Sequence, residues 1–272
     1  MAAKKDNLKK ENLMTRRTAI KVGLAGVAGL TLGMQKLFGV NNVLGLEQKK
    51  MKVIAINGSA RKDMNTATLL QQALDGAAAQ GAETEMVHLF DIKYKGCVSC
   101  LACKLKNART NGLCAYKDAL TPLLQKCREA DALIFGSPIY YDNVDGMMRS
   151  FLERLMFPLD PYTVNHEGQR ERFLTGTVPV GFIYTMNCPE QMRENFYGPM
   201  FKSVEGYLSH IFGSCHAVYS TNTYQYKDYS RYDVNLFREE DKRKWRDEQF
   251  PKDKQKSYEL GKLLVDEVKK SV

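Results

Sequence analysis

The chain has 272 residues, of which 44% are hydrophobic, so it is long enough for one α/β domain with a sizeable core and some additional segments. Its formal net charge is +9, but residues 1–50 contain 10 Lys/Arg and 3 Asp/Glu and therefore account for +7 of that charge. The remaining residues, with 30 basic and 28 acidic side chains, are nearly balanced. This balance excludes the basic footprint of a nucleic-acid-binding protein. The expected partners are small molecules or other proteins.

The first segment has the pattern of an export signal. A lysine-rich start is followed by Thr15-Arg16-Arg17-Thr18-Ala19-Ile20-Lys21 and by an uncharged run from Val22 to Gln35. This order resembles a twin-arginine signal, and a short amphipathic or buried helix is the alternative. We expect residues 1–45 to be the signal, either cleaved near residue 45 or retained as a membrane anchor. The protein is then expected to be periplasmic or otherwise extracytoplasmic, and the route favours one that loads a prosthetic group before crossing.

Strand and helix patterns alternate along residues 51–272, the expected folded domain. The strands are expected where short apolar runs occur, at 51–57, 85–89, 132–136, 178–184 and 217–223. The helices are expected at 66–79, 117–130, 144–156, 189–211 and 254–270. This alternation predicts an α/β fold, a doubly wound sheet of five parallel strands with helices on both faces, which binds ligands at the carboxyl ends of its strands. Residues 225–253, rich in tyrosine and charge, are expected to form an ordered C-terminal extension over the surface, a candidate dimer arm.

The loop between the first strand and the first helix suits a phosphate group. It reads Gly58-Ser59-Ala60-Arg61-Lys62-Asp63-Met64-Asn65-Thr66 and lacks the glycines of a dinucleotide turn and the ending of a Walker loop. A strand that turns sharply into a helix points backbone N–H groups and the positive helix end at one spot. Ser59, Arg61, Asn65 and Thr66 add further donors. The alternative is that Asn65 and Thr66 only cap the helix.

A second loop, after the third strand, makes the pattern specific. The loop G-S-x-R-x-x-x-N-T and the segment Gly136-Ser137-Pro138-Ile139-Tyr140-Tyr141-Asp142-Asn143-Val144-Asp145-Gly146 resemble the FMN phosphate loop and the flavin-ring loop of the NADPH-dependent FMN reductase and iron–sulfur flavoprotein families. The resemblance implies a flavodoxin-like fold with strand order 2-1-3-4-5 and an FMN cofactor. The residues that it implies at the ring are Pro138, Ile139, Tyr140, Tyr141, Asn143 and Gly146. Packing in the core is the alternative for the two tyrosines, and Gly146 is expected to allow close packing at the helix start. The third loop, 185–189, would complete the flavin pocket.

A loop after the second strand carries four cysteines, Cys97, Cys100, Cys103 and Cys114. Thiolates at this spacing can turn inward around a cubane of iron and sulfide, and the resemblance to iron–sulfur flavoproteins covers this segment. It implies a [4Fe–4S] cluster, although the ten residues before Cys114 are more than those proteins generally have there. A zinc site, disulfides and free thiols are the alternatives.

The other cysteines and the histidines form no ligand pattern. Cys127, Cys188 and Cys215 are expected to pack in the core. The four histidines are scattered along the chain and are expected to be structural or exposed. Hydrolysis has no support, because no Ser-His-Asp or paired-carboxylate pattern is evident.

Together these patterns predict an exported oxidoreductase or electron-transfer protein that uses FMN and a [4Fe–4S] cluster. A cluster-free NAD(P)H-dependent FMN or quinone reductase is one alternative, and a flavin electron carrier without turnover of its own is another. NAD(P)H is a candidate donor from the resemblance, but an exported protein meets little of it, so a protein, a quinone or a small oxidant is a more natural redox partner. We also expect a homo-oligomer, with a membrane tether if the signal is retained.

Overall fold

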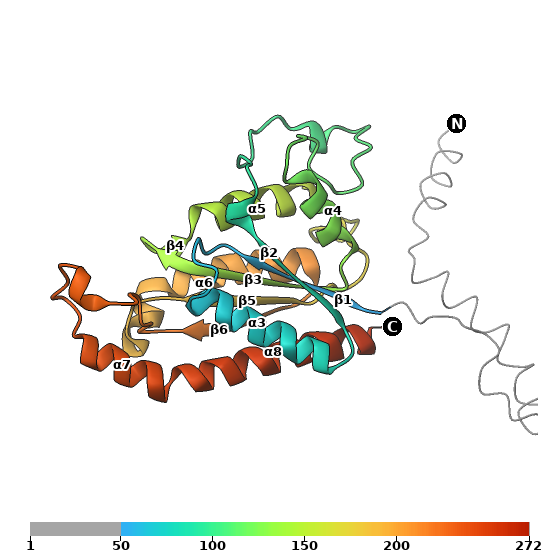
Figure 1. Cartoon of the computed structure of the whole chain (residues 1–272). Helices are drawn as coiled ribbons and strands as arrows, with labels where there is room; N and C mark the ends of the chain where they lie inside the picture. Colours follow the sequence, from blue (N-terminus) through green and yellow to red (C-terminus); the bar gives the residue numbers. More distant parts are fainter. Residues whose placement is uncertain (1–49, 272) are drawn as a thin grey trace, which may run out of the picture. The chain divides into compact units, whose positions relative to one another are not determined.

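A computed structural model describes residues 50–271 of the chain. The predicted signal segment 1–45 lies outside the described residues. Within them, five parallel strands form the centre of the molecule in the order β2-β1-β3-β5-β6 (Figure 1). The bounds are β1 Lys52–Asn57, β2 Glu83–His88, β3 Ala132–Tyr140, β5 Val180–Thr185 and β6 Cys215–Ser220. Counted as parallel strands, this is the predicted 2-1-3-4-5 order.

Helices cover both faces of the sheet. On one face lie α3 (Asn65–Ala79) and α8 (Phe250–Lys270), and on the other lie α4 (Thr121–Glu129), α5 (Gly146–Met156) and α6 (Glu190–Phe212) (Figure 1). The two helices of the first face touch at the backbone, because a Cβ at Gly261 would lie 1.8 Å from the Ala73 carbonyl oxygen. The short helices are η1 (Leu89–Asp91), η2 (Ala102–Lys104), η3 (Phe157–Leu159) and η4 (Tyr229–Arg231).

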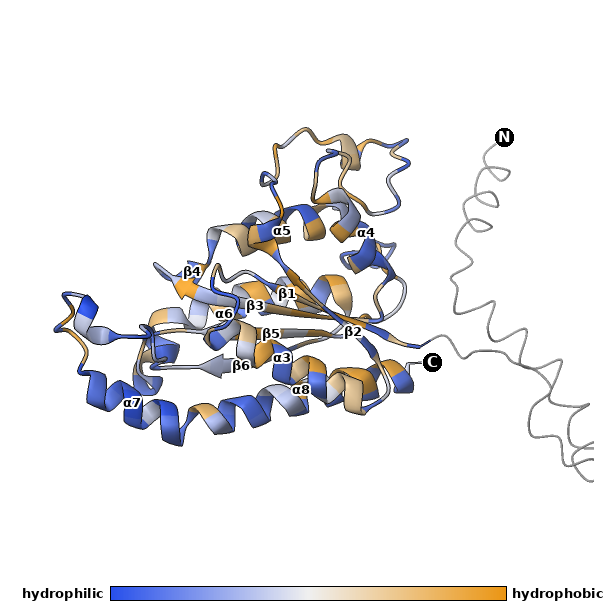
Figure 2. Cartoon of the chain, in the orientation of Figure 1, coloured by the Kyte–Doolittle hydropathy of each residue, from blue (hydrophilic) through white to orange (hydrophobic). Residues whose placement is uncertain are grey.

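The burial of the strands follows their positions in the sheet. All residues of β1 after Lys52 are buried, as are all of β5, and only Tyr140 of β3 is exposed. The edge strand β2 is exposed or half-buried throughout. The apolar strands in the middle of the sheet and the polar outer surfaces of the helices are distinct in Figure 2. The central strands are therefore the ones that form continuous apolar runs in the sequence.

Two elements differ from the expectation. The third strand is longer than predicted and turns at Tyr141 and Asp142 into a short antiparallel strand, β4 (Asn143–Val144). The region 225–253, expected as an ordered extension without predicted helices, contains η4 and α7 (Glu239–Glu248), and α8 begins within it. Helix α7 has no apolar face to reveal it, since its one buried residue is Lys242 (Figure 2). Its first turn is acidic and Arg246 lies in its last turn, which suits the helix dipole.

Candidate functional site

The three predicted loops meet at one edge of the sheet. β1, β3 and β5 are neighbours and parallel, so the loops that follow them leave the sheet on the same side. The Gly58 N–H donates to the Gly136 carbonyl oxygen at 2.8 Å, which joins the first loop to the second. The hydroxyls of Thr66 and Thr185 are 2.8 Å apart, which joins the first loop to the third.

The phosphate loop leaves the start of α3 without a side-chain cap. The helix begins at Asn65, and the residue before it, Met64, is extended and makes no capping hydrogen bond. The side chains of Asn65 and Thr66 are buried and bonded elsewhere, so the alternative in which they merely cap the helix is not what the structure contains. The first-turn N–H groups of α3 are therefore not satisfied by a cap, and an anion can bind them.

The C-terminal extension packs directly on this loop. Arg61 donates from Nη1 to the Gln225 carbonyl oxygen at 2.6 Å, and Asn65 donates from Nδ2 to the Tyr224 carbonyl oxygen at 2.9 Å. Arg246 of α7 donates from Nη1 to Asn65 Oδ1 at 2.5 Å. Among the described residues, neither guanidinium forms an ion pair with a carboxylate, so two unneutralised positive charges lie at the phosphate loop. The extension thus contacts the candidate site, and its role as a dimer arm stays a prediction.

The predicted ring loop is a hairpin. Tyr141 and Asp142 have φ values of 46° and 60°, which form the turn between β3 and β4. Pro138 and Ile139 are buried, while Tyr140 is 53% exposed and Tyr141 is fully exposed. The alternative of core packing therefore does not apply to the two tyrosines, whose side chains are free to meet a ligand.

Asp145 closes the hairpin and starts α5. Its Oδ1 accepts from the Met147 and Met148 N–H groups, and its Oδ2 accepts from the Ser137 hydroxyl at 2.8 Å. A Cβ built on Gly58 would lie 2.3 Å from the same Oδ2, so the first loop approaches the second without a side chain between them. No atom of the described residues lies within 4 Å of a Cβ built on Gly146. The prediction that Gly146 packs closely against other protein atoms is therefore wrong. The close packing occurs at Gly58 instead.

A buried lysine holds the third loop. Lys242 of α7 is 2% exposed, and its Nζ donates to the Asn187 carbonyl oxygen at 3.3 Å, to Asn222 Oδ1 at 2.5 Å and to Asn187 Oδ1. Burial lowers the pKa of Lys242 to about 8. The extension therefore forms hydrogen bonds with the third candidate loop as well as with the first.

The four cysteines of the predicted cluster line one cavity, although they lie on a long irregular segment. Cys97 and Cys100 are exposed, while Cys103 and Cys114 are half-buried. Each C-x-x-C step contains a residue in the left-handed region, Ser99 at φ 53° and Leu101 at φ 54°, which turns the chain back on itself. Among the described residues, no three His, Cys, Asp or Glu side chains are close enough to hold a single metal ion.

One residue that lines this cavity is unusual, the arginine Arg154 of α5. Its side chain is fully buried and ion-paired to Asp118 at 2.5 Å, and its Nε has no hydrogen-bond partner. The sequence could have indicated this buried charge, because Arg154 lies among the apolar residues Phe151, Leu152 and Leu155 of the helix. Lys242 and Arg246 had no such signal, since they belong to a helix that is polar on nearly every face.

Among the remaining cysteines and histidines, Cys188 lies in the third loop, and the others lie outside the three loops and the cysteine cavity. Cys127 and Cys188 are buried in the core and Cys215 packs against it, as expected. Burial raises the pKa of the Cys127 and Cys215 thiols to about 12. All seven cysteines are free thiols in the structure. His88 accepts or donates at 2.9 Å with Asn57, and His216 pairs with Glu267 at 2.6 Å.

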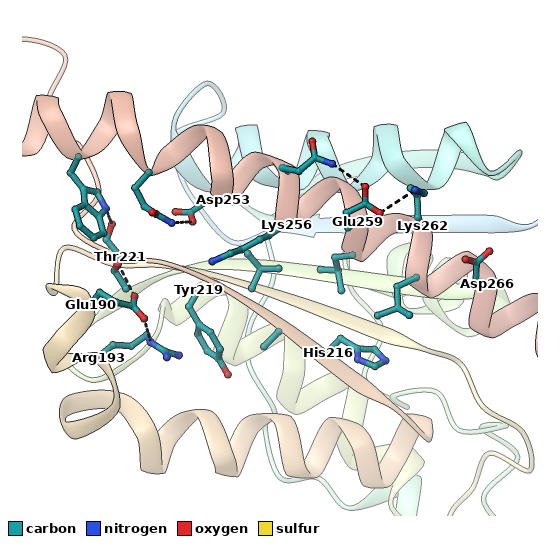
Figure 3. A pocket seen from close by; sticks show the side chains of 17 residues that line it. Glu190, Arg193, His216, Tyr219, Thr221, Asp253, Lys256, Glu259, Lys262 and Asp266 are labelled. Carbon is teal, nitrogen blue, oxygen red and sulfur yellow. Dashed lines mark hydrogen bonds and ion pairs between the residues drawn. The ribbon is translucent and has the colours of Figure 1, made fainter.

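A larger cavity lies elsewhere, along the edge strand β6 between α6 and α8 (Figure 3). Its walls combine apolar and polar side chains, with Glu190 bonded to Arg193 and Thr221, and Glu259 bonded to Lys262. None of the predicted site residues lines it. It is therefore separate from the three loops and from the cysteine cavity.

The fold is that of a flavodoxin-like, doubly wound α/β protein, with the three candidate loops at the carboxyl ends of its central strands. The family model for NADPH-dependent FMN reductase matches residues 51–208, more than half of the chain, and the chain belongs to this family of flavin-dependent oxidoreductases. No helix among residues 50–271 is long and apolar enough to cross a membrane.

Similar proteins extend this assignment. An iron–sulfur flavoprotein from Methanocaldococcus jannaschii is 38% identical over 104 residues, which cover 38% of this chain and 51% of that protein. One from Archaeoglobus fulgidus is also 38% identical over 104 residues, covering 38% of this chain and 48% of that protein. The chain thus matches about half the length of these curated relatives.

Solved structures show the same fold at low identity. A NAD(P)H:quinone oxidoreductase from Methanothermobacter marburgensis has a TM-score of 0.52 and 12% identity, covering 79% of this chain and 97% of that one. An azoreductase from Bacillus anthracis has a TM-score of 0.53 and 12% identity, covering 78% and 99%. At this identity, the similarity to these structures shows a shared fold.

Proposed function

We propose that the protein is an oxidoreductase that binds FMN at the carboxyl ends of β1, β3 and β5. The observation that carries the proposal is the uncapped start of α3 with Arg61 and Arg246 beside it, neither paired with a carboxylate among the described residues. A phosphate monoester has the negative charge and the acceptor oxygens that such a site lacks. The family assignment supports FMN as the molecule that brings it.

The chain's residues would bind and orient the cofactor. The phosphate would be held by Ser59, Arg61, Asn65 and Thr66, and the ring would lie at Pro138, Ile139, Tyr140, Tyr141, Asn143 and Gly146. The exposed tyrosines of the hairpin offer flat surfaces to a ring, and the open space beside Gly146 leaves room at the start of α5. Bound FMN would supply two-electron and one-electron chemistry, while the protein sets position and electrostatics.

We also propose that Cys97, Cys100, Cys103 and Cys114 hold a [4Fe–4S] cluster. Three observations support this assignment. The four cysteines line one cavity, Ser99 and Leu101 in the left-handed region bend the loop between them, and the matched relatives are iron–sulfur flavoproteins by name. Thiolate is the ligand that such clusters take, and a cubane spans more space than a single ion. Bound there, the cluster would accept and release single electrons.

The redox partners follow from the proposed location. The sequence Thr15-Arg16-Arg17-Thr18 supports export by the twin-arginine route, which removes the protein from the cytoplasmic NAD(P)H pool. A protein, a quinone or a small oxidant then fits better as the partner. Replacing Arg16 and Arg17 by lysine in the full chain should keep the protein in the cytoplasm, and unchanged export would contradict the proposed route.

One experiment tests the function and separates its alternatives. A form lacking residues 1–45 is purified without oxygen, and its iron, sulfide and flavin contents are measured with the absorption spectrum. About four irons per FMN would support the full proposal. FMN without iron would indicate a cluster-free flavin or quinone reductase, which steady-state assays with NAD(P)H and several acceptors distinguish from an electron carrier. Absence of bound flavin after reconstitution would contradict the proposed function.

A further inference from the structure

The contacts of Arg154, the buried arginine beside the cysteine cavity, are not fully explained by a structural role alone. Arg154 has a side chain with 0% exposure, although arginine is almost never fully buried unless it is paired. It has one carboxylate partner, Asp118, at 2.5 Å. Its guanidinium also lies over the Tyr116 ring, 5.2 Å from the centroid.

The guanidinium joins the two ends of the cysteine loop. Nη1 donates to the Lys95 carbonyl oxygen at 3.1 Å, two residues before Cys97. Nη2 donates to the Tyr116 carbonyl oxygen at 2.7 Å, two residues after Cys114. One rigid planar group on α5 therefore fixes the chain where it enters and where it leaves the segment that carries all four cysteines.

One donor of this guanidinium has no partner. Nε of Arg154 is buried without a hydrogen bond, which is destabilising if nothing else binds there. The same side chain lines the cavity with Cys97, Cys100, Cys103 and Cys114, and its guanidinium interacts with the Cys114 thiol. The unsatisfied donor and the positive charge thus belong to a residue that lines the same cavity as the four cysteines, together with the carboxylate Glu153 and several apolar side chains.

We propose that Arg154 is a positioning residue for the iron–sulfur site, where it secures Cys114 as a ligand and places a positive hydrogen-bond donor beside the sulfurs. This inference rests on the proposed cluster. Hydrogen bonds to cluster sulfurs and nearby positive charge stabilise the reduced, more negative state, so Arg154 raises the reduction potential. It also explains how Cys114 can serve after a gap of ten residues, because the clamp at Tyr116 fixes the chain just beyond it.

The same helix connects this site to the candidate flavin site. α5 begins at its cap Asp145, in the hairpin proposed to hold the ring, and carries Arg154 in its last turn. A shift of Arg154 would therefore move a helix that both sites share. FMN content serves as an internal check that a variant has kept this helix in place.

The experiment compares Arg154→Gln and Arg154→Lys with Arg109→Gln in the protein purified without oxygen. Arg109 lies on the cysteine loop and is exposed, so its variant removes the same charge from the same segment without touching the cavity. We expect Arg154→Gln to lose at least one iron in four, with the electron paramagnetic resonance signal of a three-iron cluster, while FMN content is unchanged. Arg154→Lys keeps the charge and loses the planar clamp, so it should retain iron partly.

If the variants keep four irons, the midpoint reduction potential of the cluster tests the inference. We expect the midpoint potential of Arg154→Gln to be lower, with at least a tenfold smaller ratio of reduced to oxidised cluster at a fixed potential, which is about 59 mV. The Arg109→Gln protein should match the wild type. Four irons, an unchanged potential and an unchanged spectrum in Arg154→Gln would overturn the inference while leaving the cluster itself established.

A measurement on the unmodified protein covers the case in which both variants fail to fold. Wild-type protein labelled with ¹⁵N only in arginine is reduced, and pulsed electron paramagnetic resonance is used to look for ¹⁵N coupled to the cluster. A coupled guanidinium nitrogen is the expected result. Its absence in a protein with a full cluster would overturn the inference, and a wild type without iron would overturn the proposed cluster together with it.

Discussion

Nη1 of Arg246 lies 2.5 Å from Oδ1 of Asn65, although 181 positions of sequence separate the two residues. Asn65 starts α3 in the loop proposed to hold the FMN phosphate, whereas Arg246 belongs to an extension beyond the part of the chain that the family model matches. Burial lowers the pKa of the Arg246 guanidinium, and the Phe250 ring lies 4.1 Å from it. The phosphate loop is therefore completed by a residue from outside the family region.

This relationship predicts that Arg246→Gln weakens FMN binding. A charge-assisted hydrogen bond contributes about 1.5–3 kcal/mol, so the dissociation constant should rise about 10- to 100-fold. Riboflavin lacks the phosphate, and its affinity should stay the same. Titration of the apoprotein with both flavins, followed by flavin fluorescence, measures the difference.

The matched control is Arg238→Gln at the start of the same helix. Arg238 is exposed and pairs with Glu240 and Asp241. Its variant should bind FMN as the wild type does. Equal weakening of FMN and riboflavin by Arg246→Gln would indicate a general disturbance of the extension and contradict a phosphate role.

The contact between the first two loops predicts that Gly58→Ala is destabilising. The added Cβ would lie 2.3 Å from Oδ2 of Asp145 and 3.0 Å from Cβ of Met148, and Asp145 cannot move without losing its cap of α5. We expect a loss of about 1–3 kcal/mol in the free energy of unfolding of the apoprotein, measured in urea. Gly146→Ala is the control, because nothing in the described chain lies within 4 Å of its Cβ. Equal stabilities of the two variants would contradict this account of the contact.

The sequence predicted the sheet better than it predicted the surroundings of the site. The central strands are buried on both faces, so each appears as an apolar run, and their order followed from the resemblance. β3 was expected to end at residue 136, because Ser137 and Pro138 suggest a turn. In the structure Pro138 lies near the end of the strand, and the turn is made by Tyr141 and Asp142.

Long-range contacts could not be predicted from local patterns. Asn65 was expected to donate to a ligand or to cap α3, and its amide in fact bonds to Tyr224 and Arg246 of the extension. Nothing in residues 225–253 marks such a contact, since their helix buries a lysine and no apolar stripe. The cap at Asp145 was within reach of sequence reasoning, because an aspartate directly before a helix is a common start signal.

Lys242 predicts an unusual dependence of stability on pH. Burial lowers its pKa in the folded state to about 8, while an unfolded lysine titrates near 10.4. Between these values the unfolded chain binds more protons than the folded one, so the free energy of unfolding contributed by this residue rises with pH. Below about pH 8 both states are charged and the cost of burying the charge is fully present.

The comparison is between the wild type and Lys242→Met, unfolded in urea at several pH values from 7 to 10. The stability of the wild type relative to the variant should increase across this range, on the order of 2 kcal/mol. A substitution at the exposed Lys244 on the same helix separates this effect from the general loss of a positive charge. A difference that stays constant with pH, or that shrinks, would contradict the buried cation.

The arrangement of the cysteines predicts that two similar substitutions have opposite effects. Cys114 lines the cavity with Cys97, Cys100 and Cys103, whereas Cys127 on α4 is 3% exposed and packs in the core. Cys114→Ser should reduce iron and sulfide content with little change in stability, because its side chain is half-buried and lies in an irregular loop. Cys127→Ser should keep the iron and lower the free energy of unfolding by about 1–3 kcal/mol, since it places a hydroxyl among apolar side chains. Iron analysis and urea unfolding of both variants measure this. The proposed ligand set would be wrong if Cys127→Ser lost iron or if Cys114→Ser kept all of it. In either case the cavity cysteine would not behave as a ligand, or the core cysteine would.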